Sequence, residues 1–555
     1  MTQDRPVAGS CCRALTHKEK SMITILDYGA GNVRSVINAV ERLGESVKVT
    51  SRGEDILSAE KLIFPGVGAF GSMMGILNEK GLIHALQEYV RADRPFLGIC
   101  LGMQALFEFS EESGGIQGLG ILKGKVRRFN TRLAVPHIGW NGILIRQPTR
   151  LFNGISPENK FYFVHSYHIV PDDSKVALTT TDYGYSFVSA VQRGNIIGTQ
   201  YHPEKSGAAG LCLLQNFIDD AAPVAEPPVR REATRLAKRI VACLDVRAND
   251  QGDLVVTKGD QYDVREKGAV RNLGRPVDLA RRYYEEGADE ITFLNITGFR
   301  DFPLEDMPMQ QVLQQTSRHV FVPLTIGGGI RKYTDKDGRT YSALEVAAEY
   351  FRSGADKISI GSDAVTIAED YLSRGKATGN SAIEEISRVY GSQAVVISID
   401  PRRVYVNAPQ DTPHKTLRTS LPGPKGENYC WYECTIKGGR EGRPVDAVTL
   451  AQICEKLGAG EILLNCIDRD GTNQGYDLEL IHAVKSAVSI PVIASSGAGA
   501  PEHFFEVFAQ TDAEAALAAG IFHRREVPIQ TVKDYLEGKV EIRPFEGPAT
   551  PAGHE

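Results

Sequence analysis

Short apolar runs alternate with segments of helical spacing along the first part of the chain. The runs that predict buried strands are 23–26, 62–64 and 96–99. The stretch 31–43 carries its apolar residues on one helical face, and strands that alternate with helices favour a parallel sheet. Runs at 161–164 and 196–201 predict an added antiparallel portion. We therefore expect an α/β domain over residues 22–220.

The pattern stops at a segment rich in Ala, Pro, Glu and Arg, residues 221–235, which has no apolar period and predicts a semi-rigid linker. Alternation resumes afterwards, and residues 236–545 suit one large α/β barrel. The polar stretch 1–21 has no apolar core of a secretory signal, and we expect it and residues 546–555 to be disordered tails.

The second half of the chain repeats itself. The matching segments are 240–245 with 395–400, 286–295 with 457–465, and 326–330 with 495–499. Their order is the same in both copies, and the period is too long for a solenoid. We therefore expect two (βα)4 halves that close one (βα)8 barrel.

Composition narrows the class of protein. The 555 residues exceed what one core usually serves, and 42% apolar with 24% charged residues is typical of globular protein. A net charge of −6 gives no general attraction to nucleic acid, and no apolar run is long enough for a membrane span. Nine scattered cysteines without a framework predict a reducing compartment, and we expect a cytoplasmic protein without metal or cofactor.

The first candidate site centres on Cys100, which lies between Gly98 and Gly102 at the end of a predicted strand. Glycines on both sides permit a sharp turn that exposes the sulfur. We expect a helical run at 103–109 whose N-terminus stabilises the thiolate and lowers the thiol pKa. A buried cysteine behind a glycine turn explains the pentapeptide alone equally well.

A thiolate needs a base and a residue that orients the base. His202 and Glu204 follow the predicted strand 196–201 and, two apart in an extended segment, project from one side. The backbone of residues 66–68 follows another strand end and is a candidate oxyanion hole. The other histidines of this region, which we interpret as structural, are His137, His165 and His168.

These motifs resemble those of the class I glutamine amidotransferases: PGVG at 65–68, GICLG at 98–102, and HPE at 202–204. The resemblance implies that Cys100 attacks the glutamine amide, His202 shuttles protons and Glu204 supports His202. It also implies that Val67, Gly68 and Gln104 bind glutamine.

The second candidate site contains Asp245 and Asp400, each at the end of a predicted barrel strand. That face of a (βα)8 barrel carries the chemistry, and the duplication places the two carboxylates opposite one another, as general acid/base catalysis requires. Each aspartate alone could instead cap a helix or pair with Arg247 or Arg402.

Two glycine-rich loops lie near these aspartates and predict phosphate cups, because glycines let backbone N–H groups approach an oxyanion. The residues expected in the first cup are Gly328, Gly329, Gly361 and Ser362. Those expected in the second are Gly497, Gly499 and Gly520. Two cups suggest a substrate with a phosphate at each end.

Three segments of the barrel resemble the cyclase subunit of imidazole glycerol phosphate synthase: LAKRIVACLDV at 236–246, VTKG at 256–259, and IDRDGT at 467–472 followed by GYD. The fused arrangement resembles the fungal and plant enzymes. The resemblance implies conversion of the ribulosyl-formimino intermediate of histidine synthesis (PRFAR), with ammonia from glutamine, into imidazole glycerol phosphate and AICAR. It implies that Asp245 and Asp400 are the acid/base pair, that Lys258 lies on a mobile loop near substrate, and that Thr472 binds substrate.

Four charged residues immediately precede barrel strands: Arg239, Glu290, Lys357 and Glu461. Residues at that face usually serve stability. The resemblance implies an ammonia gate, so we expect the face carrying Cys100 to cover this end of the barrel. Asn295 stands where bacterial relatives have aspartate and is given no acid/base role. Insertions near 332–342 and 402–434 are candidate lids.

Three alternatives remain: a pyridoxal-phosphate-synthase-like pair, a glutaminase fused to a sugar-phosphate-isomerase-like barrel, and a non-enzymatic scaffold. The paired aspartates and residues 467–472 disfavour the first. The Lys258 loop and the fused ammonia source, which an isomerase reaction does not need, disfavour the second. The presence of Cys100, His202 and both aspartates disfavours the third. Fusion of both activities predicts a monomer.

Overall fold

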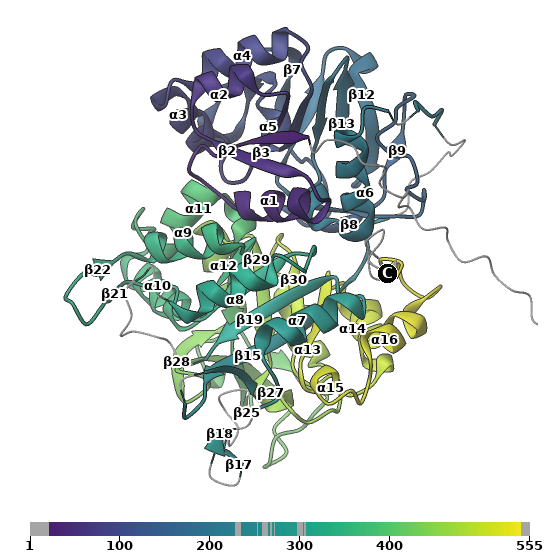
Figure 1. Ribbon diagram of the computed structural model, residues 1–555. Coiled ribbons are helices and arrows are strands. Elements are labelled where there is room, and N and C mark those ends of the chain that lie inside the picture. The colour runs from purple at the N-terminus through teal and green to yellow at the C-terminus, as the bar shows by residue number, and fades with distance from the viewer. Residues whose placement is uncertain are drawn as a thin grey trace, which may run out of the picture.

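The computed structural model describes residues 21–221, 223–227, 235–251, 253–257, 265–266, 269–270, 272–296, 304 and 307–545. These residues form an N-terminal unit, residues 21–221, and a barrel that begins at β15 (Figure 1). The expected tails lie outside the described residues apart from Ser21, and most of the expected linker does too. Among the described residues, no helix is both long and apolar enough to cross a membrane.

The N-terminal unit is built on one mixed sheet. Its parallel strands, in spatial order, are β2 (Ser46–Thr50), β1 (Met22–Leu26), β3 (Lys61–Gly66), β4 (Phe96–Cys100) and β14 (Ile196–Thr199). The sheet continues from β14 through β13 (Ser186–Arg193), β11 (Tyr167–Pro171), β7 (Leu122–Arg128), β5 (Phe107–Ser110) and β6 (Ile116–Gln117). In addition, β12 (Ala177–Asp182) pairs with β13, and β9 (Leu144–Ile145) pairs with β12. A separate antiparallel pair is β8 (His137–Asn141) and β10 (Phe161–His165). The α/β prediction is confirmed.

The helices of this unit are α1 (Val33–Arg42), α2 (Gly53–Ser58), α3 (Phe70–Glu79), α4 (Leu82–Arg91), α5 (Leu101–Gln104) and α6 (Gly207–Ile218). The expected helical run 103–109 is wrong, because α5 has a single turn and Phe107–Ser110 forms β5. Phe107 is buried and Glu108 is exposed, an alternation that suits a strand, and β5 pairs with β7. A four-residue helix also contributes less dipole to Cys100 than a longer one would.

Eight parallel strands close the barrel through pairing of the first strand with the last. They are β15 (Arg239–Ala248), β19 (Glu290–Asn295), β20 (Leu324–Gly327), β23 (Lys357–Ile360), β24 (Val395–Ile399), β29 (Glu461–Asn465), β30 (Val492–Ser495) and β31 (Ala515–Ala518). The repeated segments fall on equivalent strands, so β15 and β24, the first strands of the two halves, lie on opposite sides of the ring. This is the expected (βα)8 fold.

Helices surround the barrel strands (Figure 1). They are α7 (Pro276–Glu285), α8 (Pro308–Thr316), α9 (Ala343–Ser353), α10 (Ser362–Arg374), α11 (Ala382–Tyr390), α12 (Ala447–Lys456), α13 (Leu478–Lys485), α14 (Pro501–Thr511), α15 (Gly520–His523) and α16 (Ile529–Leu536). The short strands β17 (Arg265–Glu266) and β18 (Ala269–Val270) form a hairpin, and β16 (Leu254–Thr257) extends the sheet beside β15. The expected insertion 332–342 contains the hairpin β21 (Tyr333–Thr334) and β22 (Thr340–Tyr341).

The N-terminal unit sits on the barrel face at which the strands begin (Figure 1). Four backbone carbonyl groups that precede barrel strands accept hydrogen bonds from the N-terminal unit. The carbonyl of Asp289 accepts from the Trp140 side chain, and those of Phe321, Val389 and Ser489 accept from the backbone N–H groups of Gly207, Ala69 and Val135. Ile138, Trp140 and Tyr162 share the barrel's main hydrophobic cluster. The expected docking face is confirmed.

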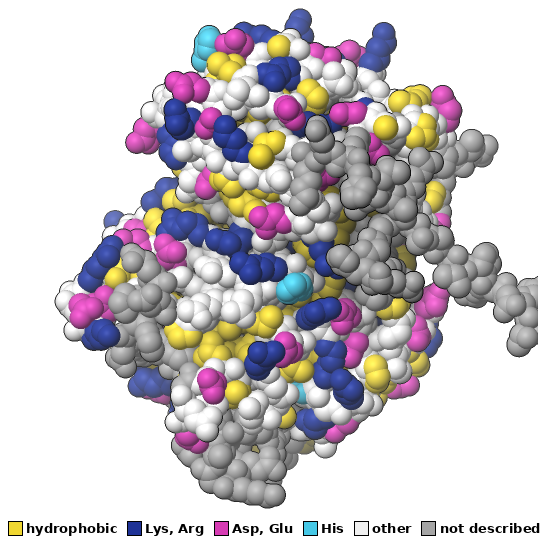
Figure 2. All heavy atoms as spheres, in the orientation of Figure 1, with side chains coloured by type: hydrophobic (Ala, Val, Ile, Leu, Met, Phe, Trp, Pro, Cys, Tyr) yellow, Lys and Arg dark blue, Asp and Glu magenta, His cyan; other side chains and the backbone are white. Residues whose placement is uncertain are grey.

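A segment that follows the barrel strands also joins the two units. Glu541 pairs with the buried Lys160 at 2.6 Å. The Arg543 guanidinium lies 4.2 Å from the centre of the Trp140 ring and pairs with Asp289 at 2.7 Å. Acidic and basic side chains are interspersed over most of the face shown in Figure 2.

Candidate active sites

Cys100 ends β4 inside a tight strand-to-helix turn. Its φ of 54° is left-handed, and its side chain is only 5% exposed. The turn needs Gly102, because a Cβ there would lie 2.0 Å from the Phe64 carbonyl oxygen. Gln200 Nε2 lies 3.4 Å from Sγ. The elbow predicted from the glycines is present, and its sulfur faces the protein interior rather than bulk solvent.

His202 and Glu204 are both buried beside this cysteine. The Glu204 Oε1 atom lies 2.8 Å from His202 Nδ1, although Pro203–Lys205 forms the 3-10 turn η3 rather than the extended segment expected. Burial alone would lower the pKa of His202, but the charges of Glu204 and Cys100 outweigh it and hold that pKa well above its ordinary value. Glu204 and Cys100 therefore both stabilise the protonated form of the His202 ring.

The candidate oxyanion loop, residues 66–68, follows β3 beside Cys100, and Gly66 is in register with Cys100. The Val67 N–H donates to the Tyr28 hydroxyl at 3.2 Å, and that hydroxyl donates to the Val67 carbonyl at 2.8 Å. In this conformation the Val67 amide is therefore occupied by Tyr28. Gly68 has a φ of 117° and lies against the barrel, where Gln393 donates to its carbonyl oxygen at 3.4 Å.

Gln104 lies in α5 and is buried. Its amide nitrogen donates to Gln200 Oε1 at 3.0 Å and to the Tyr167 carbonyl at 3.1 Å, whereas its Oε1 atom is buried without a partner. A buried acceptor without a partner is costly unless a ligand donates to it. Of the other histidines, His137 and His165 contact each other at 3.1 Å, and burial lowers the pKa of both. They form a neutral aromatic cluster, as a structural role requires.

The four charged residues before the barrel strands form one closed ring, and each is 0% exposed. Arg239 contacts Glu290 at 2.7 Å and also pairs with Glu461. Lys357 Nζ lies 2.6 Å from both glutamates. The four residues are the first residues of β15, β19, β23 and β29, so they lie at the strand-start face, as expected. The ring lies between the N-terminal unit and the barrel interior.

An apolar layer lines the barrel above the ring. Side chains alternate along a strand, so every second residue of β15 points inward: Arg239, then Val241, Cys243 and Asp245. The buried cluster at this level consists of Val241, Cys243, Val396, Leu463, Ile493, Ala515 and Leu517. The barrel interior thus changes from ionic to apolar to polar along its axis.

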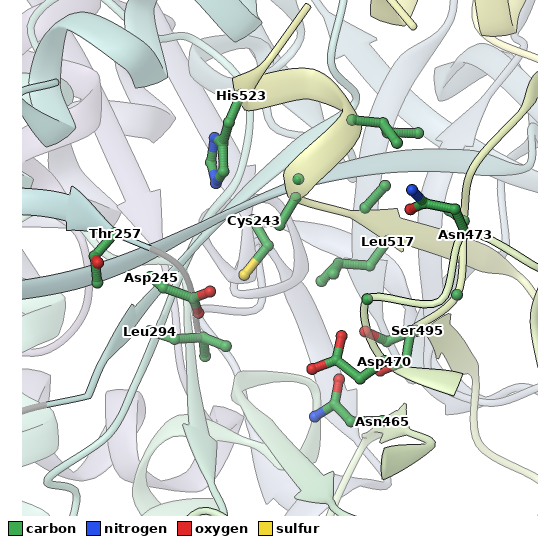
Figure 3. A pocket seen from close by; sticks show the side chains of 18 of the residues that line it. Cys243, Asp245, Thr257, Leu294, Asn465, Asp470, Asn473, Ser495, Leu517 and His523 are labelled. Atoms are coloured by element: carbon green, nitrogen blue, oxygen red, sulfur yellow. The ribbon is translucent and has the colours of Figure 1, made fainter. Parts of the chain in front are cut away.

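At the far mouth a cavity of about 520 Å³ is lined by both predicted aspartates. Figure 3 shows Asp245 on one side, with Asn465 and Asp470 on the other. The Asn465 amide donates to Asp400 Oδ1 at 2.8 Å. Burial raises the pKa of Asp400, the nearby Asp470 charge raises it further, and the Asn465 hydrogen bond opposes both. The two halves of the duplicated barrel thus each supply one carboxylate.

The first predicted cup is assembled from neighbouring strand ends, since Gly327 pairs with Ser359. Gly328 and Gly329 have φ values of 89° and 77°, and Gly361 caps the thirteen-residue helix α10, which starts at Ser362. The Lys437 N–H donates to Ser362 Oγ at 3.1 Å. These four residues lie together at the mouth but do not line the cavity described above.

In the second predicted cup, Gly497 and Gly520 line the cavity and Gly499 does not. The Gly499 N–H donates to His503 Nδ1 at 3.1 Å, so it is already engaged. Thr472 is exposed at the rim, and its hydroxyl donates to the Arg469 carbonyl at 2.8 Å. Lys258 lies outside the described residues.

Sequence reasoning missed several residues of these sites: Tyr28, Glu112, Gln200, Asn465 and Asp470. Asn465 could have been identified from the sequence, because the internal repeat aligns it with Asn295 at a strand end. No sequence pattern marks Glu112. Its carboxylate accepts a hydrogen bond from the Phe70 N–H at 3.1 Å, just beyond the oxyanion loop. Burial raises the pKa of Glu112 to about 7.

Two protein families match the chain. Residues 24–221 match the family described as glutamine amidotransferase class-I, and residues 239–528 match that described as histidine biosynthesis protein. Together the two matches cover both units.

Among curated proteins, the chain is 59% identical over 531 residues to "Imidazole glycerol phosphate synthase hisHF, chloroplastic" of Arabidopsis thaliana, covering 94% of this chain and 90% of that protein. It is 55% identical to "Imidazole glycerol phosphate synthase hisHF" of Schizosaccharomyces pombe, covering 93% and 98%. The barrel alone is 42% identical to "Imidazole glycerol phosphate synthase subunit HisF" of Methanobrevibacter smithii, covering 56% of this chain and 99% of that one.

Proposed function

The chain belongs to the imidazole glycerol phosphate synthase family, and on that premise we propose which of its residues carry out the two reactions. It is an enzyme with a glutamine amidotransferase domain and a cyclase domain of histidine biosynthesis. We assign the first domain to residues 22–220 and the second to 236–545, joined by the linker 221–235. The alternative barrels have no counterpart in these relatives.

In the first reaction, Cys100 Sγ attacks the side-chain amide carbon of glutamine. His202 takes the thiol proton and returns it to the departing nitrogen, so ammonia leaves and a γ-glutamyl thioester forms. Water then hydrolyses the thioester to glutamate. Glu204 keeps the His202 ring oriented through the 2.8 Å contact. Val67 and Gly68 supply the oxyanion loop, and the unpartnered Gln104 Oε1 supports a role in holding glutamine.

Ammonia then enters the barrel through the ring of Arg239, Glu290, Lys357 and Glu461. The closed ring of ion pairs supports a gate, since ammonia passes only if a pair separates. The apolar layer above it supports delivery of neutral ammonia, because a charged ammonium ion is costly to desolvate.

In the second reaction, ammonia reacts with PRFAR to give imidazole glycerol phosphate and AICAR. Asp245 and Asp400 act as general acid and base, supported by their positions on opposite walls of one cavity. The two cups hold the terminal phosphates: Gly328, Gly329, Gly361 and Ser362 in one, and Gly497, Gly499, Gly520 and Thr472 in the other. We also assign Lys258 a role in binding substrate, as the resemblance implies.

The observation that carries the proposal is the placement of two sites at opposite ends of one barrel. The test supplies purified protein with PRFAR and either glutamine or ammonium salt. Cys100→Ala should lose only the glutamine-driven reaction, and loss of both would refute this division of labour. Asp245→Asn should form no imidazole product from either nitrogen source, and retained turnover would remove Asp245 from the mechanism.

We also propose that the enzyme works as a monomer in the cytoplasm. Fusion of both activities supports the first point. Seven free cysteines among the described residues support a reducing compartment. Light scattering after size-exclusion chromatography tests the first, and cell fractionation tests the second, against the plastid location that the Arabidopsis thaliana relative's name gives.

A further inference from the structure

A small sheet starts immediately after Asp400, within the insertion noted in the sequence. Its strands are β25 (Pro401–Val406), β26 (Leu417–Arg418), β27 (Tyr429–Ile436) and β28 (Glu441–Asp446). Thr435 of β27 donates to the Asp400 carbonyl oxygen through its N–H at 3.1 Å and its hydroxyl at 2.6 Å. The small sheet therefore holds the backbone of a residue that faces the cavity.

Arg403 is the buried cation of this sheet, with its side chain 4% exposed. Its guanidinium makes a bidentate contact with Asp477, from Nε at 3.0 Å and Nη2 at 2.9 Å. The same group reaches Glu479 at 3.2 Å. Its backbone N–H donates to Asp468 Oδ2 at 2.7 Å. All three carboxylates belong to the loop between β29 and α13 or to the start of that helix.

Asp477 is the central acceptor. Besides Arg403, its carboxylate accepts from the Tyr432 hydroxyl at 2.9 Å and from Cys466 Sγ at 3.3 Å, and it caps α13 through the Leu480 N–H at 3.1 Å. This carboxylate is almost fully buried and fully hydrogen-bonded. Such a network has one favoured geometry, because each displaced group would leave a desolvated charge.

The loop held at Asp468 and Asp477 carries part of the cavity wall between those points. Asp470, Gly471 and Asn473 line the cavity (Figure 3 labels Asp470 and Asn473). The Gly475 N–H also donates to the Gly497 carbonyl of the second cup at 2.8 Å. Arg403 therefore contacts both ends of segment 468–477, which carries Asp470 near Asp400.

We propose that Arg403 is a positioning residue for the cyclase reaction, which clamps residues 468–477 so that Asp470 stays in place beside Asp400. This inference rests on the proposed function of the cavity. Within the described part of the chain, the Arg403 side chain hydrogen-bonds Asp477, Glu479 and Thr419, none of which lines the cavity, so we assign its effect to the loop. The bidentate geometry explains arginine at this position, since lysine offers one point charge and cannot match both carboxylate oxygens.

The test compares Arg403→Gln with Arg402→Gln in the full-length protein. Arg402 is the neighbouring residue, its side chain is 42% exposed, and its ion pair within the described residues joins it to Glu433 of the small sheet at 2.6 Å. Ammonia-driven conversion of PRFAR is measured at steady state. We expect kcat of Arg403→Gln to fall about 10- to 100-fold, as misplacement of active-site groups does, with KM nearly unchanged. Arg402→Gln should stay close to the parent.

A double-mutant cycle with Asp470→Asn separates positioning from general weakening of the fold. If Arg403 acts through Asp470, adding Arg403→Gln to Asp470→Asn should lower kcat little further. Multiplicative losses would overturn the proposal, as would a parental kcat for Arg403→Gln. A rise in KM alone would show that the loop anchors substrate and would also overturn it.

If Arg403→Gln does not fold, Tyr432→Phe takes its place in the same cycle, because it removes only the neutral donor to Asp477. It should show a smaller loss of the same non-additive kind, and additive behaviour overturns the proposal. Failure of the parent protein to convert PRFAR with ammonium salt would instead refute the proposed function. An active parent with an equally active Arg403→Gln would refute the positioning role alone.

Discussion

At the residue scale, Asp400, a proposed catalytic residue, is buried at an energetic cost to the folded state. Its folded-state pKa lies above the ordinary value, mainly because burial disfavours the carboxylate. A group with a raised folded pKa contributes stability below its unfolded pKa and loses it as pH rises through the folded pKa. Above its unfolded-state pKa, Asp400 therefore makes a net unfavourable contribution to folding.

Asp400→Asn should consequently raise the midpoint of thermal unfolding at pH 7.5 while abolishing cyclase turnover. The gain should shrink as the pH is lowered toward the ordinary carboxyl pKa, because Asp400 then becomes neutral in the parent as well. Differential scanning calorimetry at several pH values measures this. A lower midpoint at pH 7.5 would contradict the assigned cause of the shift.

Tyr28 provides a second residue-scale prediction. Its hydroxyl occupies the Val67 amide, which the proposed oxyanion loop needs. Tyr28→Phe should therefore raise glutamine hydrolysis in the absence of PRFAR by about an order of magnitude, since one oxyanion donor is worth about 10²–10³ in rate.

Tyr89→Phe is the matched control, because the Tyr89 hydroxyl is also buried but donates to the Pro95 carbonyl, away from the loop. Its basal glutaminase rate should equal the parent rate. An unchanged rate in Tyr28→Phe would show that the Tyr28 contact does not restrain the loop.

Individual residues were predictable where a local pattern fixes them. Cys100 sits at a glycine-flanked strand end, and Arg239 and Glu461 each begin an apolar run, so position along the strand sets their layer. Tyr28 with Val67, and Arg403 with Asp477, carry no such pattern. Their contacts join segments 39 and 74 positions apart, and only the fold brings them together.

At the element scale, the Cys100 turn depends on close backbone packing between α5 and β3. Gly102→Ala places a Cβ 2.0 Å from the Phe64 carbonyl oxygen, a backbone atom that cannot move aside. We expect a loss of about 3 kcal/mol or more in the stability of the N-terminal unit and no glutaminase activity.

Gly75→Ala in α3 is the opposite case, because a Cβ there meets nothing within 4 Å. It should stabilise the N-terminal unit by about 0.5–1 kcal/mol through helix propensity. Chemical unfolding followed with glutaminase assays distinguishes the two. A Gly102→Ala protein with parental glutaminase activity would show that the turn can relax.

The same turn shows where element prediction failed. Residues 103–109 satisfy helical spacing, but Phe107 to Ser110 also alternate, and pairing of β5 with β7 decides between the two. Tertiary pairing of this kind is invisible in a single sequence. The barrel strands were easier, because two copies of each pattern supported one another.

At the scale of the whole molecule, docking over the strand-start face places the proposed ammonia path between the N-terminal unit and the ring. With unlabelled glutamine and added ¹⁵N-ammonium salt together, most imidazole product should therefore carry unlabelled nitrogen. Mass spectrometry of the product measures the partition. Isotope ratios equal to those of the bulk solution would mean that ammonia leaves the protein before it reacts.

The contacts of Glu541 and Arg543 with Lys160 and Trp140 give this assembly an order in time. A ribosome completes the N-terminal unit long before it reaches residue 541, so that unit can fold while the barrel is still being synthesised. Its contacts with Glu541 and Arg543 can form only after every barrel strand has been made. A nascent chain stalled within the barrel would thus lack these contacts between the two units.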